Sequence, residues 1–204
     1  MKHTINMSAR YALILLIVVA VFGCKGSTPP VTFYTLTPIP AIQDGGSGQA
    51  VLKDALIGIG PVKFPKILDR PQIVTRPATG QLNLAEFKRW GGFLKDDFLS
   101  VMAENMTTLL GTDQVVTYPW PGGLNPAYRI EFDVHQFDGK LGDSVVLRVS
   151  WILKTPGQTD NTHLKRSTIF QPVSGPDYDA LVAAKSMALE KLSRIVLDEM
   201  KNII

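Results

Sequence analysis

Cysteine is almost absent from this chain: its 204 residues contain only one, Cys24. A single cysteine excludes an internal disulfide bond and a zinc site built from cysteines. Histidine is scarce too, and His135 and His163 accompany no local pattern of carboxylates, so we expect no metal site. Like charges never run beyond two residues. Without a basic stretch carrying interleaved aromatic residues, the sequence predicts no nucleic-acid partner.

The chain also lacks the short motifs that accompany common enzyme chemistries. It contains no Gly-x-Ser-x-Gly nucleophile elbow and no Gly-x-x-x-x-Gly-Lys-Ser/Thr phosphate loop. Gly58-Ile59-Gly60 precedes Pro61 and more strand-like sequence, whereas a dinucleotide fingerprint continues into a helix. Asp96 and Asp97 fall on a predicted helix, where paired carboxylates usually form a solvated face. We therefore expect a binding or assembly protein that is not an enzyme and needs no cofactor.

The one long uncharged run lies near the start of the chain, from Tyr11 to Phe22. At about a dozen residues it is too short for a transmembrane helix, which needs roughly 20, and it is typical of the apolar part of a signal peptide. Lys2 and Arg10 supply a basic region before it. Val21-Phe22-Gly23-Cys24 then resembles a lipobox, although Phe22 is larger than the residue usual at that position.

These features predict a bacterial lipoprotein precursor in which residues 1–23 are a signal peptide and Cys24 is acylated. The cysteine thiolate takes a diacylglyceryl group, and the freed amine can take a further acyl chain. Two or more chains give durable membrane anchoring, at about 0.8 kcal/mol per buried CH₂. The alternative is a buried free cysteine in a cytosolic domain. Loss of the signal lowers the Lys and Arg count from 21 to 19, against 18 acidic residues.

Proline, glycine, serine and threonine dominate residues 25–32 and 38–49, which predicts extended or flexible chain. Phe33-Tyr34-Thr35-Leu36 between them is strand-like. We therefore expect residues 24–49 to form the lipidated cysteine, a tether and a first short strand. Residues 50–204 are of a length typical of one domain.

Within this domain, apolar periodicity alternates between the spacing of strands and that of helices. An apolar stripe predicts an amphipathic helix over 84–110, with Asn83 as N-cap, Glu86 as its capping-box partner and Gly111 as its end. Gly91-Gly92 costs about 1 kcal/mol per glycine inside a helix, so two helical pieces are an alternative. A second helix is expected after Ser174–Asp177. Strands are expected over 51–64, 69–76, 114–118, 128–134, 145–153 and 162–173.

Turn-rich sequence between the last strands predicts hairpins, and hairpins predict an antiparallel sheet. With the two helices packed against one face, the expected fold is α+β: a largely antiparallel sheet with two main helices, in a single domain behind a lipidated tether.

Four stretches together resemble the ABC-type transport auxiliary lipoproteins of the PqiC/YmbA type. They are Phe33–Leu36, Ile57–Arg76, Trp90–Gly111 and the late helix, and the run DRPQIVTR is the most specific part. The family more often has Ala-Glu where this chain has Gly91-Gly92. The resemblance covers nearly the whole mature chain. It implies a non-catalytic, lipid-anchored partner of MCE-type systems, which move phospholipid or other apolar molecules between membranes.

On this resemblance, the protein would dock to an MCE-domain tunnel protein. The alternative is a stand-alone periplasmic carrier of lipid or another apolar ligand. Trp90, Leu94, Phe98 and Trp151 would line a pocket in a carrier and fill an ordinary core in an auxiliary protein. Lys25 follows the cysteine where enteric-type sorting places Asp for inner-membrane retention, so we expect the periplasmic face of the outer membrane. A homo-oligomer is compatible with the sequence.

The segment from Asp69 to Arg76 is the expected contact site for the partner, through Asp69, Arg70, Pro71, Gln72 and Arg76. Pro65 shortly before it and Pro71 within it fix their own φ and favour extended backbone at the residue before them. A stiff segment loses little entropy on binding. The alternative is that Asp69 and Arg70 only satisfy turn backbone or pair with each other, and that the following residues are plain sheet.

Overall fold

The fold is described here from a computed structural model that places residues 11, 28–40, 52, 54–155 and 162–203. The predicted signal peptide, Cys24 and much of the tether lie outside these described residues. Backbone contacts divide the chain into two units, Met1–Pro30 and Val31–Ile204, and the fold below is that of the second. None of the helices among the described residues has the length and apolar character of a membrane-spanning segment.

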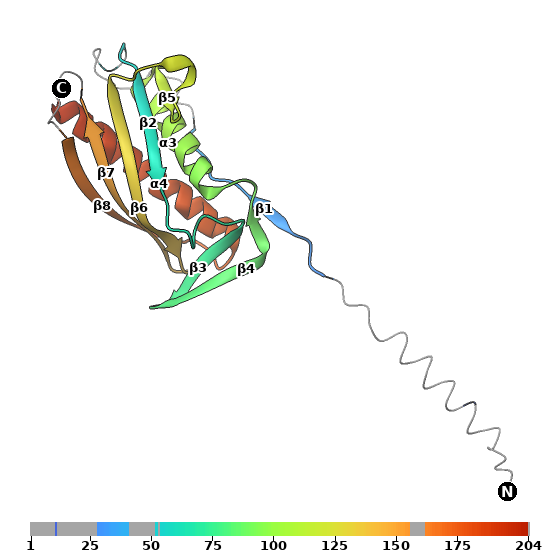
Figure 1. The fold of residues 1–204 in the computed structure, drawn as a ribbon. Helices are drawn as coiled ribbons and strands as arrows, with labels where there is room; N and C mark the ends of the chain where they lie inside the picture. Colours follow the sequence, from blue (N-terminus) through green and yellow to red (C-terminus); the bar gives the residue numbers. More distant parts are fainter. Residues whose placement is uncertain (1–10, 12–27, 41–51, 53, 156–161, 204) are drawn as a thin grey trace, which may run out of the picture. The chain divides into compact units, whose positions relative to one another are not determined.

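The larger of two sheets has five strands in the order β5-β2-β6-β7-β8 (Figure 1). Its long strands β6 (Tyr128–Gly139), β7 (Ser144–Lys154) and β8 (Thr162–Pro172) form an antiparallel meander, as the hairpin prediction requires. Strands β2 (Ile57–Lys63) and β5 (Val115–Thr117) complete it, and β2 runs parallel to both β5 and β6. The sheet is therefore mixed but mostly antiparallel.

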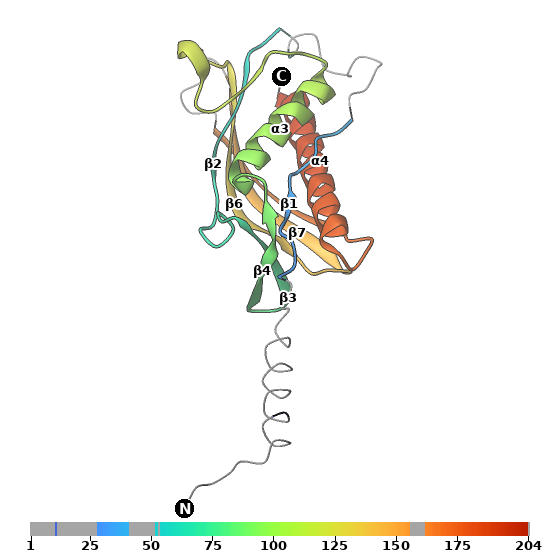
Figure 2. The same ribbon diagram turned by 90° about the vertical axis from the view of Figure 1, so that its right-hand side faces the viewer.

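Helices α3 (Leu94–Leu110) and α4 (Tyr178–Ile203) lie side by side on one face of this sheet (Figure 2). Alternate strand residues point towards the helices and form the core with the apolar stripes of both helices, as with Ile130, Phe132 and Val134 on β6. No helix of the described residues covers the other face of β6, β7 and β8, and we call it the open face. The expected α+β architecture, with both helices on one face, is confirmed.

The smaller sheet has the order β1-β4-β3 and contains β1 (Thr32–Tyr34), β3 (Gln72–Ala78) and β4 (Gln81–Trp90). It corrects the prediction of a helix over 84–110. Residues 84–90 are strand, paired antiparallel with β3 and parallel with β1. Pairing on both edges overrides the helical spacing of the apolar residues, and Gly91-Gly92 separates this strand from α3.

Of the two predicted helix ends, the N-terminal one is wrong and the C-terminal one is confirmed. Asn83 is not an N-cap: it lies in β4 opposite Thr75, and Glu86 is an exposed strand residue. Phe93 holds the N-cap position of α3 without a side-chain capping hydrogen bond. Gly111 ends the helix as predicted, with φ 65° in the left-handed region and its N–H donating to the Thr107 carbonyl.

The chain after β1 is fastened to both helices. The Leu36 N–H donates to the Asp97 carboxylate at 3.2 Å, and the Thr37 N–H donates to Ser186 Oγ at 3.0 Å. The Ile39 N–H donates to Asn105 Oδ1 at 2.8 Å. The first strand is thus fixed to the main body although it lies early in the sequence.

Candidate functional site

The predicted contact segment lies at the end of the fold formed by the small sheet, opposite the end where the chain terminates (Figures 1 and 2). A tight turn precedes it, because the N–H groups of Leu68 and Asp69 both donate to the Pro65 carbonyl at 2.9 and 3.2 Å. The Pro71 carbonyl accepts from the Trp90 N–H at 2.7 Å. The backbone of this loop is therefore held on both sides.

Side chains of the loop are available at the surface to different degrees. Asp69 and Pro71 are exposed, whereas Arg70 and Gln72 are half-buried. The Nε of Arg70 is buried and has no hydrogen-bond partner among the described residues. Asp69 and Arg70 form no ion pair with each other there, so the guanidinium is not used by the turn itself.

Arg76 differs from the rest of the segment because its guanidinium is occupied. Its Nε and Nη2 donate to the two carboxylate oxygens of Asp138 at 3.0 and 2.8 Å, and Gln136 Nε2 donates to the same carboxylate at 2.7 Å. The hydrogen bond to Asp138 raises the pKa of Arg76. Asp138 is 1% exposed. Arg76 therefore connects the β3–β4 hairpin to β6. Its guanidinium is occupied by this contact, unlike that of Arg70 in the exposed loop.

A buried lysine lies behind this contact on the helix side of the sheet. Lys185 of α4 is 1% exposed, and its Nζ donates to the Phe137 carbonyl at 2.7 Å. The Nζ lies 4.4 Å from the centroid of the Phe137 ring and 5.2 Å from that of Trp90. Burial lowers the pKa of Lys185 to about 7, and the charge of Asp138 opposes that shift.

Sequence reasoning missed both Asp138 and Lys185. Asp138 begins a turn-rich run between two predicted strands, and nothing in that run indicates a buried carboxylate. Lys185 did leave a signal, because it lies four residues from Leu181 and from Leu189 on the apolar face of the last helix.

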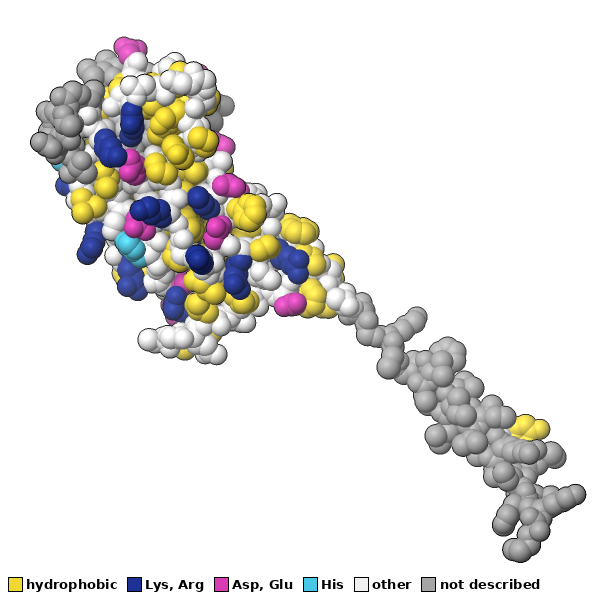
Figure 3. Space-filling model, viewed as in Figure 1, with side chains coloured by type: hydrophobic (Ala, Val, Ile, Leu, Met, Phe, Trp, Pro, Cys, Tyr) yellow, Lys and Arg dark blue, Asp and Glu magenta, His cyan; other side chains and the backbone are white. Residues whose placement is uncertain are grey.

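The open face carries mixed charge and scattered apolar side chains (Figure 3). Glu131 pairs with Lys154, and His135 Nε2 lies 2.8 Å from Ser150 Oγ. Arg148 and Arg166 form no ion pair with any described residue. They border a depression of about 440 Å³ that His135 also lines. The two guanidinium groups give this depression positive charge.

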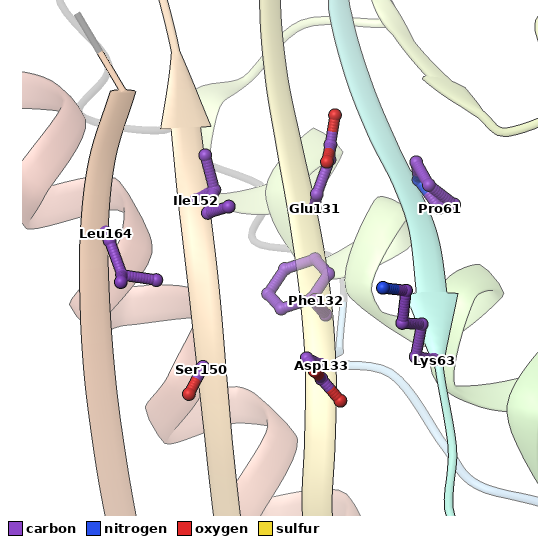
Figure 4. A pocket seen from close by; sticks show the side chains of 8 residues that line it. All are labelled: Pro61, Lys63, Glu131, Phe132, Asp133, Ser150, Ile152 and Leu164. Carbon is purple, nitrogen blue, oxygen red and sulfur yellow. The ribbon is translucent and has the colours of Figure 1, made fainter.

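Beside that depression lies a smaller, amphipathic hollow of about 160 Å³. Figure 4 shows Lys63, Glu131 and Asp133 on β2 and β6, with Ile152 and Leu164 on the two neighbouring strands. Pockets that enclose small ligands usually measure about 300–1,000 Å³. The hollow is thus too small to enclose an acyl chain and is better suited to one side chain of a partner.

The four side chains that distinguish a carrier from an auxiliary protein lie in the core. Trp90, Leu94, Phe98 and Trp151 are at most 3% exposed. Phe98 packs edge-on against Phe64, Phe132 and Phe137, with ring centroids 5.4, 5.5 and 6.1 Å apart. Trp151 Nε1 donates to Ser167 Oγ at 3.0 Å. These contacts are those of packed interior residues.

Among the residues that the structure describes, no three His, Cys, Asp or Glu side chains gather closely enough to hold a metal ion. The loop around Arg70 and the open face both present arginine side chains without an ion pair among the described residues.

Comparison with known proteins identifies the family. Residues 34–196 match the family described as "ABC-type transport auxiliary lipoprotein component", and no curated protein sequence matches the chain. An uncharacterized protein of known crystal structure is similar with a TM-score of 0.68 at 17% identity, over 84% of this chain and 99% of that one. A Xanthomonas campestris protein of family DUF330 follows with a TM-score of 0.63 at 16% identity, over 85% and 100%. These structures support the fold, and because the family match spans most of the sequence, the chain belongs to the ABC-type transport auxiliary lipoprotein component family.

Proposed function

We propose that this protein is the lipid-anchored periplasmic component of an MCE-type ABC system that moves lipid between membranes, and that it works by docking to the tunnel protein. The observation that carries the proposal is the family match over residues 34–196, which makes the protein an auxiliary component of an ABC-type transport system. The lipobox-like Val21–Cys24 supports acylation at Cys24. Lys25 supports sorting to the periplasmic face of the outer membrane.

The loop Asp69–Gln72 is the docking site in this proposal. Its backbone is held by the turn at Pro65 and by the hydrogen bond from Trp90 to Pro71, so little conformational entropy is lost when a partner binds. Arg70 presents a guanidinium without an ion-pair partner among the described residues, and arginine is enriched among the residues that dominate interfaces. Arg76 supports the loop from behind through Asp138 instead of contacting the partner.

A stand-alone lipid carrier is less well supported, because Trp90, Leu94, Phe98 and Trp151 are buried against protein atoms. A carrier would need these side chains to line a ligand cavity.

The docking site is tested by crosslinking in cells followed by recovery of the MCE-domain protein. Arg70→Ala should weaken capture by about 30-fold, the equivalent of roughly 2 kcal/mol for an interface arginine, with little change in melting temperature. Arg166→Ala is the matched control, because it removes an unpaired arginine from the open face. If Arg70→Ala captures as much MCE-domain protein as the parent does, the loop is not the docking site. If only Arg166→Ala loses capture, the docking site is on the open face.

The anchor is tested separately. Mass spectrometry of the mature N-terminal peptide should find an acylated Cys24, and Cys24→Ser should leave the precursor unprocessed. Separated membranes should yield the protein with the outer membrane. Recovery only with the inner membrane contradicts the proposed location, and an unmodified chain that keeps Met1 contradicts the anchor.

A further inference from the structure

Large apolar side chains are exposed around the first strand. Val31 is 40% exposed and Phe33 is 65% exposed. Val31 immediately precedes β1 and Phe33 lies within it. Residues two apart in extended chain point to the same side, so these two side chains share one face. Phe93, which follows β4 and precedes α3, is 58% exposed. By contrast, Phe98 and Phe137 are completely buried in the core.

Backbone pairing brings these residues to one place. β1 runs parallel to β4 with Phe33 opposite Arg89, and the Gly91 N–H donates to the Tyr34 carbonyl at 2.7 Å. That bond holds the turn before Phe93 against the end of β1. We call Val31, Phe33, Arg89 and Phe93 the β1 patch. Figure 3 shows hydrophobic side chains near β1 and β4, with basic and acidic ones among them.

The charge of the β1 patch is positive. Arg89 forms no ion pair with a described residue, and its one hydrogen bond is from Nε to the Glu86 carbonyl at 3.3 Å. Its other donors are free for phosphate groups, which arginine binds in a bidentate manner. Apolar and aromatic side chains beside a cation are the composition of surfaces that lie at the boundary between lipid headgroups and acyl chains.

The length of chain before β1 limits where this surface can be. Cys24 precedes Val31 by seven residues, which span at most about 25 Å when fully extended. The 12 residues of β6 are roughly 40 Å long at the usual rise per strand residue. An acyl group on Cys24 therefore holds the β1 end of the domain near the bilayer, and the opposite end can lie farther away.

We propose that the β1 patch inserts its apolar side chains into the headgroup region of the membrane that holds the acyl chains, which gives the anchored domain one orientation. The proposal rests on acylation at Cys24. The bonds from Leu36, Thr37 and Ile39 to the helices hold the patch rigidly on the body. Contact at β1 therefore orients α3, α4 and the sheet together, with the β3–β4 hairpin close to the bilayer.

The test uses the acylated full-length mature protein in vesicles of phosphatidylethanolamine and phosphatidylglycerol. Because the single cysteine loses its thiol on acylation, Phe33→Cys and Phe93→Cys each offer one site for an environment-sensitive fluorophore. Phe170→Cys is the matched control, since Phe170 of β8 is 64% exposed but lies on the open face. Probes at 33 and 93 should shift to shorter wavelength and be quenched at least threefold more by headgroup-region spin-labelled lipid than the probe at 170.

The possible outcomes distinguish a failure of the proposed membrane contact from a failure of the proposed acylation. Mass spectrometry of each preparation reports acylation, so an unacylated Cys24 counts against the anchor in the proposed function. If Cys24 is acylated and the probes at 33 and 93 remain in water, the membrane contact is overturned. Equal quenching at 33 and 170 overturns the single orientation. Protection at 33 that grows with protein density without lipid quenching means that a second copy covers the patch, and it also overturns the proposal.

Discussion

Replacing Lys185 by methionine should stabilise the protein at neutral pH and remove a pH dependence of its stability. Lys185 is 1% exposed, and burial lowers its pKa from 10.5 to about 7. Between those two pH values the unfolded chain binds a proton at Lys185 that the folded protein does not. Stability therefore rises with pH across this window and is lost as pH falls towards 7, below which the difference stays constant.

The size of this change in the free energy of unfolding is set by the one proton that Lys185 binds in the unfolded chain but not in the folded protein. A difference of one bound proton changes the free energy of unfolding by about 1.4 kcal/mol per pH unit. From pH 7.5 to 9.5 the parent should gain about 2–3 kcal/mol, slightly less than for a full proton, because Lys185 of the folded protein is still partly protonated at pH 7.5 and that of the unfolded chain is partly deprotonated at pH 9.5. Lys185→Met keeps a side chain of similar length and removes the proton site, so its gain over this interval should be near zero.

Urea unfolding of residues 24–204 carrying Cys24→Ser, which lack both signal peptide and acyl chains, measures this effect at constant ionic strength. Lys191→Met is the matched control, because Lys191 is an exposed lysine of the same helix. It should keep the pH dependence of the parent. If the parent and Lys185→Met respond identically between pH 7.5 and 9.5, Lys185 is charged in the folded state and the reasoning is wrong.

Three further substitutions test the packing by urea unfolding. Phe98→Ala should lower the free energy of unfolding by about 3–5 kcal/mol because the ring is fully buried. Phe170→Ala, at an exposed position, should change it by less than about 0.5 kcal/mol. Equal losses of stability in the two variants would contradict the burial of Phe98. Asp138→Ala should cost about 3 kcal/mol by leaving Arg76 without its carboxylate, and adding Arg76→Met should recover part of that loss; strictly additive losses would deny the coupling. Gly111→Ala should cost about 1 kcal/mol because φ is 65° there, and an unchanged stability would contradict the left-handed helix end.

The meander and the last helix were predictable because their apolar residues recur at the regular spacing of strands and of a helix. Alternation of apolar and polar residues over 128–134 and 145–153 gave the faces of β6 and β7, and the turn-rich sequence between them gave the hairpin. The stripe after Asp177 gave α4. In these elements one face is buried and the other is wet, so the local pattern and the tertiary environment agree.

β4 was misassigned because its apolar residues satisfy helical spacing by accident. Of Leu84, Phe87 and Trp90, only Trp90 is buried in the core, and Leu84 is 39% exposed. The strand exists because β1 and β3 supply hydrogen bonds on its two edges. β1 lies more than 50 residues earlier than its partner residues in β4, so no local window contains that information. Gly91-Gly92 was the one local sign of a break.

The contact segment was predictable in position but not in the division of its side chains. The prolines and the charges marked Asp69–Arg76 as stiff and polar. That Arg76 faces a buried carboxylate could not be foreseen from the local sequence, because Asp138 lies 62 residues later in the chain, on β6, which packs against β3. Whether the loop binds a partner stays a prediction.

The fastening of the first segment to the helices has a mechanical consequence. In the proposed anchoring, force that a partner exerts on the domain reaches the bilayer partly through the chain between Cys24 and the body. β1 alone has three residues and would peel from β4 under modest load. The hydrogen bonds from Leu36 to Asp97, Thr37 to Ser186 and Ile39 to Asn105 share that load with α3 and α4, and Leu36 itself is buried. The segment that follows β1 is thus attached to the domain at several successive residues, so no single hydrogen bond carries the whole force.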